Sequence, residues 1–227
     1  MDAEALTACR EHKSELKSLS AERVWAETKK LLTAPSPHRT VNVMLINGIL
    51  ETILPEASNS EGLQLLCELE GQINLPIDPY LRLMSMSARD ELAMARLCKR
   101  LKMSNKEKVR LMQWARDRTE LVTGVDDKKA QIAFYKAGQQ VAMDRSLIRA
   151  AGCTDPIVRQ AWLSLYTRAK NWQRPDFPLA GKDLMDAGIP PGPKIGKMLT
   201  ALEALWVRSG FQADKKKLLM ALALLNR

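Results

Sequence analysis

This chain of 227 residues contains very few histidines, and none of its cysteines lie close together in the sequence. It has two histidines and four cysteines, and the cysteines at 9, 67, 98 and 153 are far apart in sequence. A zinc site or a redox pair needs clustered ligands, and the sequence contains no such cluster. Separated cysteines are typical of reduced, buried thiols, so we expect a cytoplasmic protein.

Long apolar runs are also missing. No stretch approaches the roughly 18 apolar residues that indicate a membrane span, and the acidic N-terminus does not resemble a signal peptide. The sequence contains neither a Walker-type loop nor a dinucleotide-binding glycine loop. It therefore predicts no membrane partner, no nucleotide site of those two kinds and no cofactor held by this chain.

Charge is present but unevenly distributed. The net charge is +9, yet residues 1–95 carry 9 Lys or Arg against 14 Asp or Glu. Residues 96–118 carry 9 against 2, and residues 119–227 carry 17 against 10. Such an asymmetry favours a polyanionic partner for the C-terminal part. The alternative is a basic surface that is merely solvated, and composition alone does not separate the two.

Apolar residues recur with helical spacing along the chain, and no segment alternates convincingly as a strand would. Ser104 with Glu107 has the pattern of a capping box, and Asp155 followed by proline is typical of a helix start. The same spacing places Leu92 and Val109 on core-facing sides. We therefore expect an all-α fold, an elongated multi-helix bundle that ends in a helical-hairpin subdomain.

The most informative stretch is FPLAGKDLMDAGIPPGPKIGKML, residues 177–199. A short helix is expected from about Lys182 to Ala187, and Gly188 suits its left-handed C-cap. The prolines that follow cannot continue a helix, whereas Pro193 suits the first turn of a new one. The start of a helix is electropositive and has unpaired N–H groups, so this corner predicts a phosphate site. A plain hairpin with solvated lysines is the alternative.

The stretch also resembles the tail motif of bacterial CCA-adding enzymes, the tRNA nucleotidyltransferases, and of the related poly(A) polymerases. Eleven positions carry this resemblance: Leu179, Ala180, Gly181, Asp183, Leu184, Gly188, Ile189, Gly192, Pro193, Ile195 and Gly196. Ala180 departs from the hydroxyl residue that is usual there. A second segment, Leu19 to Leu32, resembles the neck signature of the same family, in which Ser20, Arg23 and Glu27 are expected to be structural. A surface ion pair between Arg23 and Glu27 is the simpler alternative.

The resemblance implies three parts: a neck-like helical segment at residues 1–58, a helical body at 59–152 and a helical tail at 153–227. It further implies a tRNA partner, with RNA contacts at Lys182, Gly192, Lys194, Gly196 and Lys197 in the hairpin, at Arg168, Lys170 and Arg174 before it, and at Arg96, Lys99 and Arg100 in a basic helix.

The metal-binding carboxylates and the Gly-Ser turn of the family's N-terminal head have no counterpart in this sequence. The resemblance therefore implies a non-catalytic portion whose partner is a nucleotidyltransferase head that uses Mg²⁺ with ATP and CTP. Three other interpretations stay open: the matching region of a poly(A) polymerase, a DNA-binding hairpin module, and a protein-interaction bundle.

Overall fold

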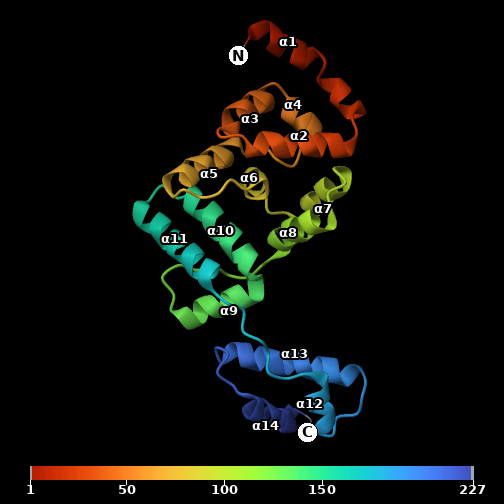
Figure 1. Ribbon diagram of the computed structural model, residues 1–227, viewed down its shortest axis with the longest axis vertical. Coiled ribbons are helices and arrows are strands. Elements are labelled where there is room, and N and C mark those ends of the chain that lie inside the picture. The colour runs from red at the N-terminus through yellow and green to blue at the C-terminus, as the bar shows by residue number, and fades with distance from the viewer. Residues whose placement is uncertain (1, 226–227) are drawn as a thin grey trace.

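A computed structural model describes residues 2–225, and it is all-α, as expected: no strand occurs within that range. The helices form an elongated stack, and the two termini lie at opposite ends of it (Figure 1). The first half contains α1 (Ala3–Glu11), η1 (Lys13–Ser18), α2 (Ala21–Thr33), α3 (Pro37–Ile46), α4 (Ile49–Ile53), α5 (Ser60–Gln72), α6 (Pro79–Met86), α7 (Glu91–Arg100) and α8 (Asn105–Arg116). The second half contains α9 (Asp127–Ala137), α10 (Gln139–Ala151), α11 (Pro156–Asn171), α12 (Gly181–Asp186), α13 (Pro193–Arg208) and α14 (Lys215–Leu225). None of these helices is both long and apolar enough to cross a membrane.

Local sequence signals define most helix ends. Ser20 accepts a hydrogen bond from the N–H of Arg23 and caps α2, and Asp155 accepts from the first turn of α11. Gly138 has a φ of 87°, which ends α9 and lets α10 start at once. The start at Asp155 is the one that the sequence predicts, because capping depends on residues only three or four apart.

The largest core joins α2 through α8 with α10. Leu63, Leu66, Leu97 and Leu111 are completely buried in it. By contrast, α1 and η1 bury no residue and extend from the end of the stack (Figure 1).

The expectation that Leu92 and Val109 face the core was wrong, since 70% and 53% of their surfaces are exposed. Met94 on α7 and Leu111 on α8 are buried instead. Neighbouring positions on a helix differ by about 100°, and only tertiary packing selects which face is covered.

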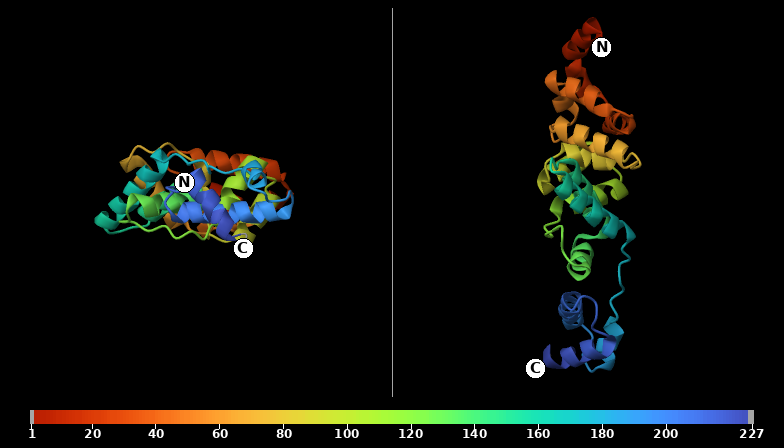
Figure 2. Two further views of the ribbon diagram at one scale, coloured as in Figure 1. Left: turned by 90° about the horizontal axis from the view of Figure 1, so that it is seen from below. Right: turned by 90° about the vertical axis from the view of Figure 1, so that its left-hand side faces the viewer.

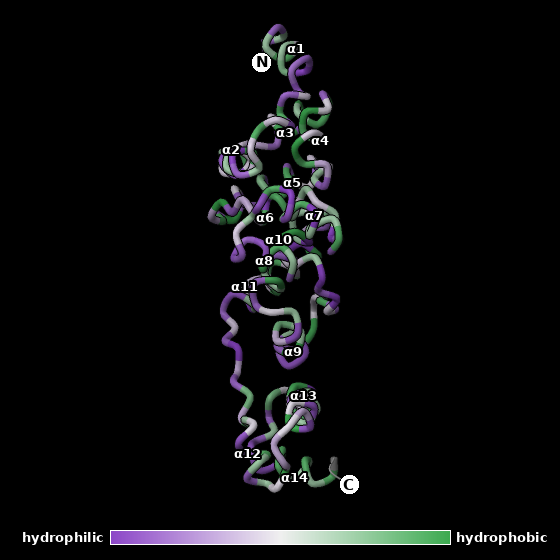
Figure 3. The backbone as a smooth tube through the Cα atoms, turned by 90° about the vertical axis from the view of Figure 1, so that its right-hand side faces the viewer, coloured by the Kyte–Doolittle hydropathy of each residue, from purple (hydrophilic) through white to green (hydrophobic). Residues whose placement is uncertain are grey.

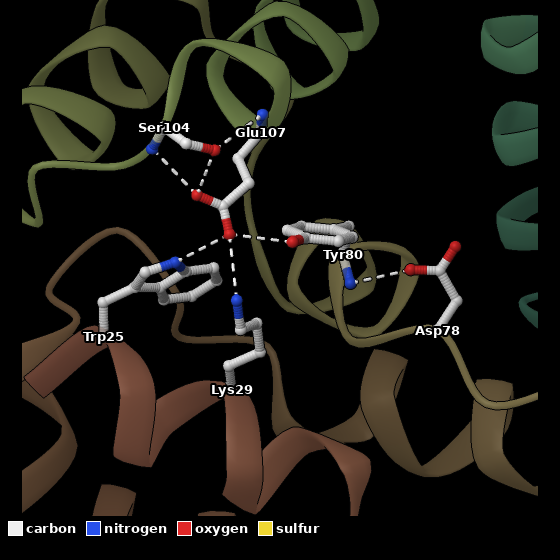
Figure 4. A network of polar contacts seen from close by, with 6 residues as sticks. All are labelled: Trp25, Lys29, Asp78, Tyr80, Ser104 and Glu107. Carbon is white, nitrogen blue, oxygen red and sulfur yellow. Dashed lines mark hydrogen bonds and ion pairs between the residues drawn. The ribbon is translucent and has the colours of Figure 1, made fainter. Parts of the chain in front are cut away.

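One partly buried carboxylate, whose side chain is 12% exposed, connects three helices of this core. Glu107 on α8 accepts hydrogen bonds from the indole N–H of Trp25 and the ammonium of Lys29 on α2, each at 3.1 Å, and from the hydroxyl of Tyr80 on α6 at 2.8 Å (Figure 4). Its second oxygen accepts from the N–H of Ser104 at 2.8 Å and completes the predicted capping box.

These contacts shift two pKa values. Burial alone would raise the pKa of Glu107, but the hydrogen bonds from Ser104, Tyr80 and Trp25 outweigh it and lower the pKa to about 2. Burial, together with the hydrogen bond to Glu107, raises the pKa of Tyr80 to about 12. The carboxylate is therefore charged, and the phenol neutral, over the physiological pH range.

A second buried pair lies nearby. The guanidinium of Arg82 on α6 contacts the carboxylate of Glu70 on α5 at 2.6 Å, and the side chains are only 2% and 4% exposed. Arg82 also donates to the carbonyl oxygens of Leu32 and Ala34, so it fixes the end of α2 against α5 and α6. A buried charge of this kind needs all of these partners.

The tail is separated from the rest by an extended segment, residues 172–180, which we call the linker. Figure 2 shows the linker running alone between α11 and α12, and Figure 3 shows that the portion next to α11 is hydrophilic. Beyond it, α12, α13 and α14 enclose their own apolar cluster, which includes Leu184, Leu202 and Leu222. By contrast, the buried residues of α11, Leu165 and Ala169, pack with α9 and α10.

Tyr135 on α9 connects the tail to the body, because it packs against residues of the tail. Its ring packs against Trp206 and Phe211 at centroid distances of 5.7 and 5.3 Å, and its hydroxyl donates to Glu203 on α13. Arg174 of the linker lies over the same ring, 3.9 Å from its centroid. Burial, followed by the neighbouring carboxylate of Glu203, raises the pKa of Tyr135.

Candidate nucleic-acid interface

The Gly/Pro corner, residues 188–197, forms the hairpin that the sequence predicts. Helix α12 ends at Asp186, and Gly188 has the left-handed φ of 89° that a C-cap requires. Ile189 is 4% exposed and packs into the tail cluster beneath the corner. Pro193 is the first residue of α13, and the preceding Gly192, with a φ of 148°, provides no side-chain cap.

The outer side of the corner is open. Gly192, Lys194, Gly196 and Lys197 are exposed, as is Lys182 on α12. A Cβ added at Gly192 or Gly196 would meet no atom within 4 Å, so an anion can approach the start of α13 without obstruction. The helix dipole makes this end positive. The corner is therefore exposed and not enclosed in the core, and both the phosphate site and the alternative of a plain hairpin with solvated lysines stay predictions.

Asp183, a carboxylate of α12 near the corner, already has partners. Asp183 accepts a hydrogen bond from the N–H of Ala180 at 2.8 Å, and its other oxygen contacts the ammonium of Lys215 at 2.5 Å. The bond to Lys215 lowers the pKa of Asp183. Asp183 thus fixes the first turn of α12, where Ala180 cannot cap through its side chain.

Arg168 and Arg174, two of the predicted RNA contacts before the hairpin, bind other residues of the chain. Arg168 donates to the carbonyl oxygens of Val125 and Asp126 at 3.0 and 2.9 Å and forms an ion pair with Asp127 at 2.8 Å. Arg174 donates to the carbonyl oxygen of Tyr135, whose ring it covers.

Lys170, at the end of α11, is exposed. The structure shows what these three side chains contact within the chain, and their role toward RNA stays a prediction.

The basic residues of α7 lie in a different part of the molecule from the corner (Figure 1). Arg100 donates to the carbonyl oxygen of Ile53 and forms an ion pair with Glu56 at 2.5 Å. Arg96 and Lys99 are exposed, and neither pairs with another residue of the described range 2–225. The structure does not bring these three residues into one patch with the hairpin lysines.

The neck residues line an apolar groove. Arg23 and Glu27 are exposed at its edge, and its walls include Leu16, Leu31 and Met44, around a volume of about 260 Å³. No ion pair joins Arg23 to Glu27, although both lie within the described chain. Their position beside this groove is compatible with a structural role, which stays a prediction.

Tertiary structure reveals a second basic site that the sequence analysis missed. Four arginines form what we call the arginine cluster: Arg118, Arg145 and Arg149 all lie close enough to Arg89 to interact with it electrostatically, as does Asp117. Arg89 precedes α7, Arg118 follows α8, and Arg145 and Arg149 lie one turn apart on α10. Partial burial, followed by the positive charge of Arg145, lowers the pKa of Arg89, whereas the negative charge of Asp117 opposes this shift.

Only part of the cluster's charge is neutralised inside the chain. Arg145 forms an ion pair with Asp117, whose side chain is 8% exposed. Arg118 donates to backbone carbonyl oxygens, whereas Arg89 and Arg149 are exposed and pair with no other residue from 2 to 225. One planar guanidinium group can donate two parallel hydrogen bonds to two oxygens of the same phosphate. In the sequence, the signs of this site were the spacing of Arg145 and Arg149 and the position of Arg118 at the end of the basic segment 96–118.

Comparison with known proteins gives two matching family models. The model described as "Probable RNA and SrmB- binding site of polymerase A" matches residues 1–61. The model described as "tRNA nucleotidyltransferase domain 2 putative" matches residues 80–222.

Curated relatives point the same way. The chain is 28% identical over 221 residues to CCA tRNA nucleotidyltransferase 1, mitochondrial, of Mus musculus, which covers 96% of this chain and 49% of the relative. It is 27% identical to the Homo sapiens protein of that name, with 96% and 49% covered, and 27% identical to the CCA-adding enzyme of Limosilactobacillus fermentum, with 91% and 50% covered. The chain thus spans about half the length of the curated relatives it matches. Because the second model covers more than half of the sequence, the chain belongs to the tRNA nucleotidyltransferase domain 2 family.

Proposed function

We propose that this chain is the tRNA-binding region of a CCA-adding tRNA nucleotidyltransferase, which holds tRNA by its phosphates and shape during 3′-end maturation. The observation that carries the proposal is the exposed Gly/Pro corner at the start of α13, in a chain whose relatives are named for CCA addition. Phosphate contacts supply affinity and register without reading sequence.

The arginine cluster supports the same proposal from another part of the fold. A folded RNA presents phosphates over tens of ångströms, so an elongated protein can contact it at two separate basic sites. Double-stranded RNA is recognised mostly by shape and by backbone groups. We propose that the corner and the arginine cluster are two such sites.

A catalytic head, Mg²⁺ and the nucleotides ATP and CTP are part of the proposal for the whole enzyme. Residues 2–225 contain no group of three or more His, Cys, Asp or Glu side chains in metal-binding geometry. The side chains described here therefore do not fit a metal site, and we assign them no step in nucleotide transfer. The cytoplasmic location expected from the separated cysteines stays a prediction.

The packing refines the proposed division of the chain. Because α11 packs with α9 and α10, we propose that the body continues through Asn171 and that the tail begins beyond the linker. The boundary of the neck-like segment at residue 58 stays a prediction, and α2, α3 and α4 share the largest core with α5 through α8 and α10. Limited proteolysis tests this division, since cleavage should occur first between residues 172 and 180.

Binding of a tRNA transcript at several salt concentrations tests the function. Each phosphate contact adds about 0.7–0.9 to the slope of log affinity against log salt. The double variant Lys194→Ala, Lys197→Ala should reduce that slope by roughly 1.4–1.8. The double variant Lys129→Ala, Lys136→Ala removes the same charge from exposed positions of α9, away from both proposed basic sites, and should leave it nearly unchanged.

Equal slopes for the two double variants would refute the assignment of the corner. Competition separates the alternatives, because tRNA should displace duplex DNA of equal length and unstructured poly(A). If the poly(A) competes as well as tRNA, the poly(A) polymerase alternative is favoured. If no nucleic acid binds with salt dependence, the chain is a protein-interaction bundle.

A further inference from the structure

A cleft at the joint between body and tail has no role in the proposed phosphate contacts. It lies between α9, the end of α11 with the linker, and the turn that follows α13 at residues 209–212, and it encloses about 490 Å³. Figure 1 shows these segments facing one another across the joint. Small-molecule sites typically occupy roughly 300–1,000 Å³, so the cleft is large enough for a ligand of modest size.

Aromatic rings line the cleft from three elements. Phe134 on α9 is buried and contacts the half-buried Trp172 edge-on, with a centroid distance of 6.0 Å. Phe211 lies in the turn after α13 and is held at 4.9 Å from Trp206.

The backbone of Phe211 has a left-handed φ of 66°, a conformation that bulky residues rarely adopt. Strain of this kind persists where a side chain must be held in place, and it concentrates at binding sites.

Carboxamide side chains complete the lining. Gln131, Asn171 and Gln173 all border the cleft, and none of them forms a side-chain hydrogen bond with the described residues 2–225. A carboxamide offers a donor and an acceptor side by side, which matches the edge of a nucleobase. Unpaired RNA bases are generally bound by this combination of aromatic stacking and edge hydrogen bonds.

The charge of the cleft argues against a phosphate ligand. Its arginine, Arg168, forms an ion pair with Asp127 at 2.8 Å, and its two terminal nitrogens each donate to a backbone carbonyl oxygen. No positive charge is left over in the lining for a phosphate group. The ligand that fits is a neutral, planar heterocycle.

We propose that this cleft binds one unpaired nucleobase of the RNA that the corner and the arginine cluster hold. The inference rests on the proposed function, because it assigns the base to the same bound RNA. Helix α13 has 16 residues, with the corner at its first residue and the cleft beyond its last. At 1.5 Å per residue the two sites are roughly 24 Å apart along one rigid element, which fixes the base relative to the phosphates.

Chemical probing of a tRNA transcript tests the proposal. Dimethyl sulfate and a carbodiimide modify unpaired bases, so a base in the cleft should be protected when saturating protein binds. The double variant Gln131→Ala, Gln173→Ala should restore its reactivity and weaken tRNA binding by about 5–30-fold, the equivalent of two lost hydrogen bonds. The matched control is Gln72→Ala, Gln160→Ala, which removes two exposed carboxamides outside the cleft.

Both double variants alter side chains without internal hydrogen bonds, so circular dichroism should show unchanged folding. Identical protection and affinity in the cleft variant, while tRNA still binds, would overturn the cleft and leave the proposed function intact. Calorimetry with AMP, CMP, GMP and UMP distinguishes the source of the base. Binding of mononucleotides without any protected tRNA base would overturn the RNA source in favour of free nucleotides, and absence of tRNA binding by the unaltered chain would overturn the proposed function itself.

Discussion

Replacing Glu107 with Gln is the perturbation whose outcome the structure specifies most fully. The substitution keeps the size of the side chain but removes its charge and turns one acceptor oxygen into a donor. The oxygens of Glu107 accept from Trp25, Lys29, Tyr80 and Ser104, which belong to α2, α6 and the start of α8 (Figure 4). A glutamine amide would therefore face donors that it cannot satisfy, and the contacts between these helices should weaken.

The pKa gives the size of the effect. A shift from the ordinary value of 4.5 to about 2 corresponds to roughly 3 kcal/mol. The carboxylate borders a cavity of about 430 Å³ that water can enter, so screening reduces this figure. We expect Glu107→Gln to lower the free energy of unfolding by about 2 kcal/mol at pH 7, which is roughly 4–8 °C in Tm for a chain of this length.

The pH dependence gives the sign of the effect independently. Because folding lowers the pKa of Glu107, its contribution is complete above about pH 4.5 and is lost as the pH falls toward 2. The difference in stability between the unaltered chain and the variant should therefore be largest at neutral pH and should shrink in acid. Urea denaturation followed by circular dichroism at pH 7, 5, 4 and 3 measures this difference.

Glu22→Gln is the matched control for this substitution. Glu22 pairs with Lys102 at 2.9 Å, but the side chains are 58% and 64% exposed, and exposed pairs contribute little. Its variant should therefore be as stable as the unaltered chain at pH 7. A Glu107→Gln variant that is no less stable than this control, or whose deficit persists undiminished at pH 3, would refute the reasoning.

Three further outcomes are expected. The double variant Arg89→Ala, Arg149→Ala should reduce the salt slope of tRNA binding by roughly 1.4–1.8, and an unchanged slope would remove the arginine cluster from the interface. Arg82→Ala leaves Glu70 buried without its partner and should lower the free energy of unfolding by about 3–5 kcal/mol. Urea denaturation measures this loss, and a loss below about 1 kcal/mol would mean that water replaces the guanidinium. Gly188→Ala adds a Cβ to a residue with a left-handed backbone conformation and should lower the free energy of unfolding by about 1–2 kcal/mol. An unchanged stability in urea denaturation would show that the corner can rearrange.

Residues close together in sequence account for what could be predicted. The hairpin is the clearest case: Gly188 ends one helix, Pro193 starts the next, and the open corner between them follows from their backbone preferences. The capping box of Ser104 and Glu107 is another, since both partners lie within one turn. Helix periodicity likewise predicted the all-α class, although it misplaced Leu92 and Val109.

Glu107 also shows where local reasoning ends. One of its oxygens caps its own helix, as predicted, but the other is held by side chains 27 to 82 residues away. Arg168 shows the same limit, because its position in the sequence indicated an RNA contact while its guanidinium is held by residues 41 to 43 positions away. A side chain's partners across the fold decide whether its charge is available.

The sequence by itself determined the all-α class, the helix ends and the Gly/Pro corner, because each depends on the conformational preferences of residues a few positions apart. Tertiary structure alone decided the arginine cluster, the Glu107 network and the cleft at the joint of body and tail. Their members come from separate helices, and electrostatic and packing energies act through distance in space, which residue spacing along the chain does not record.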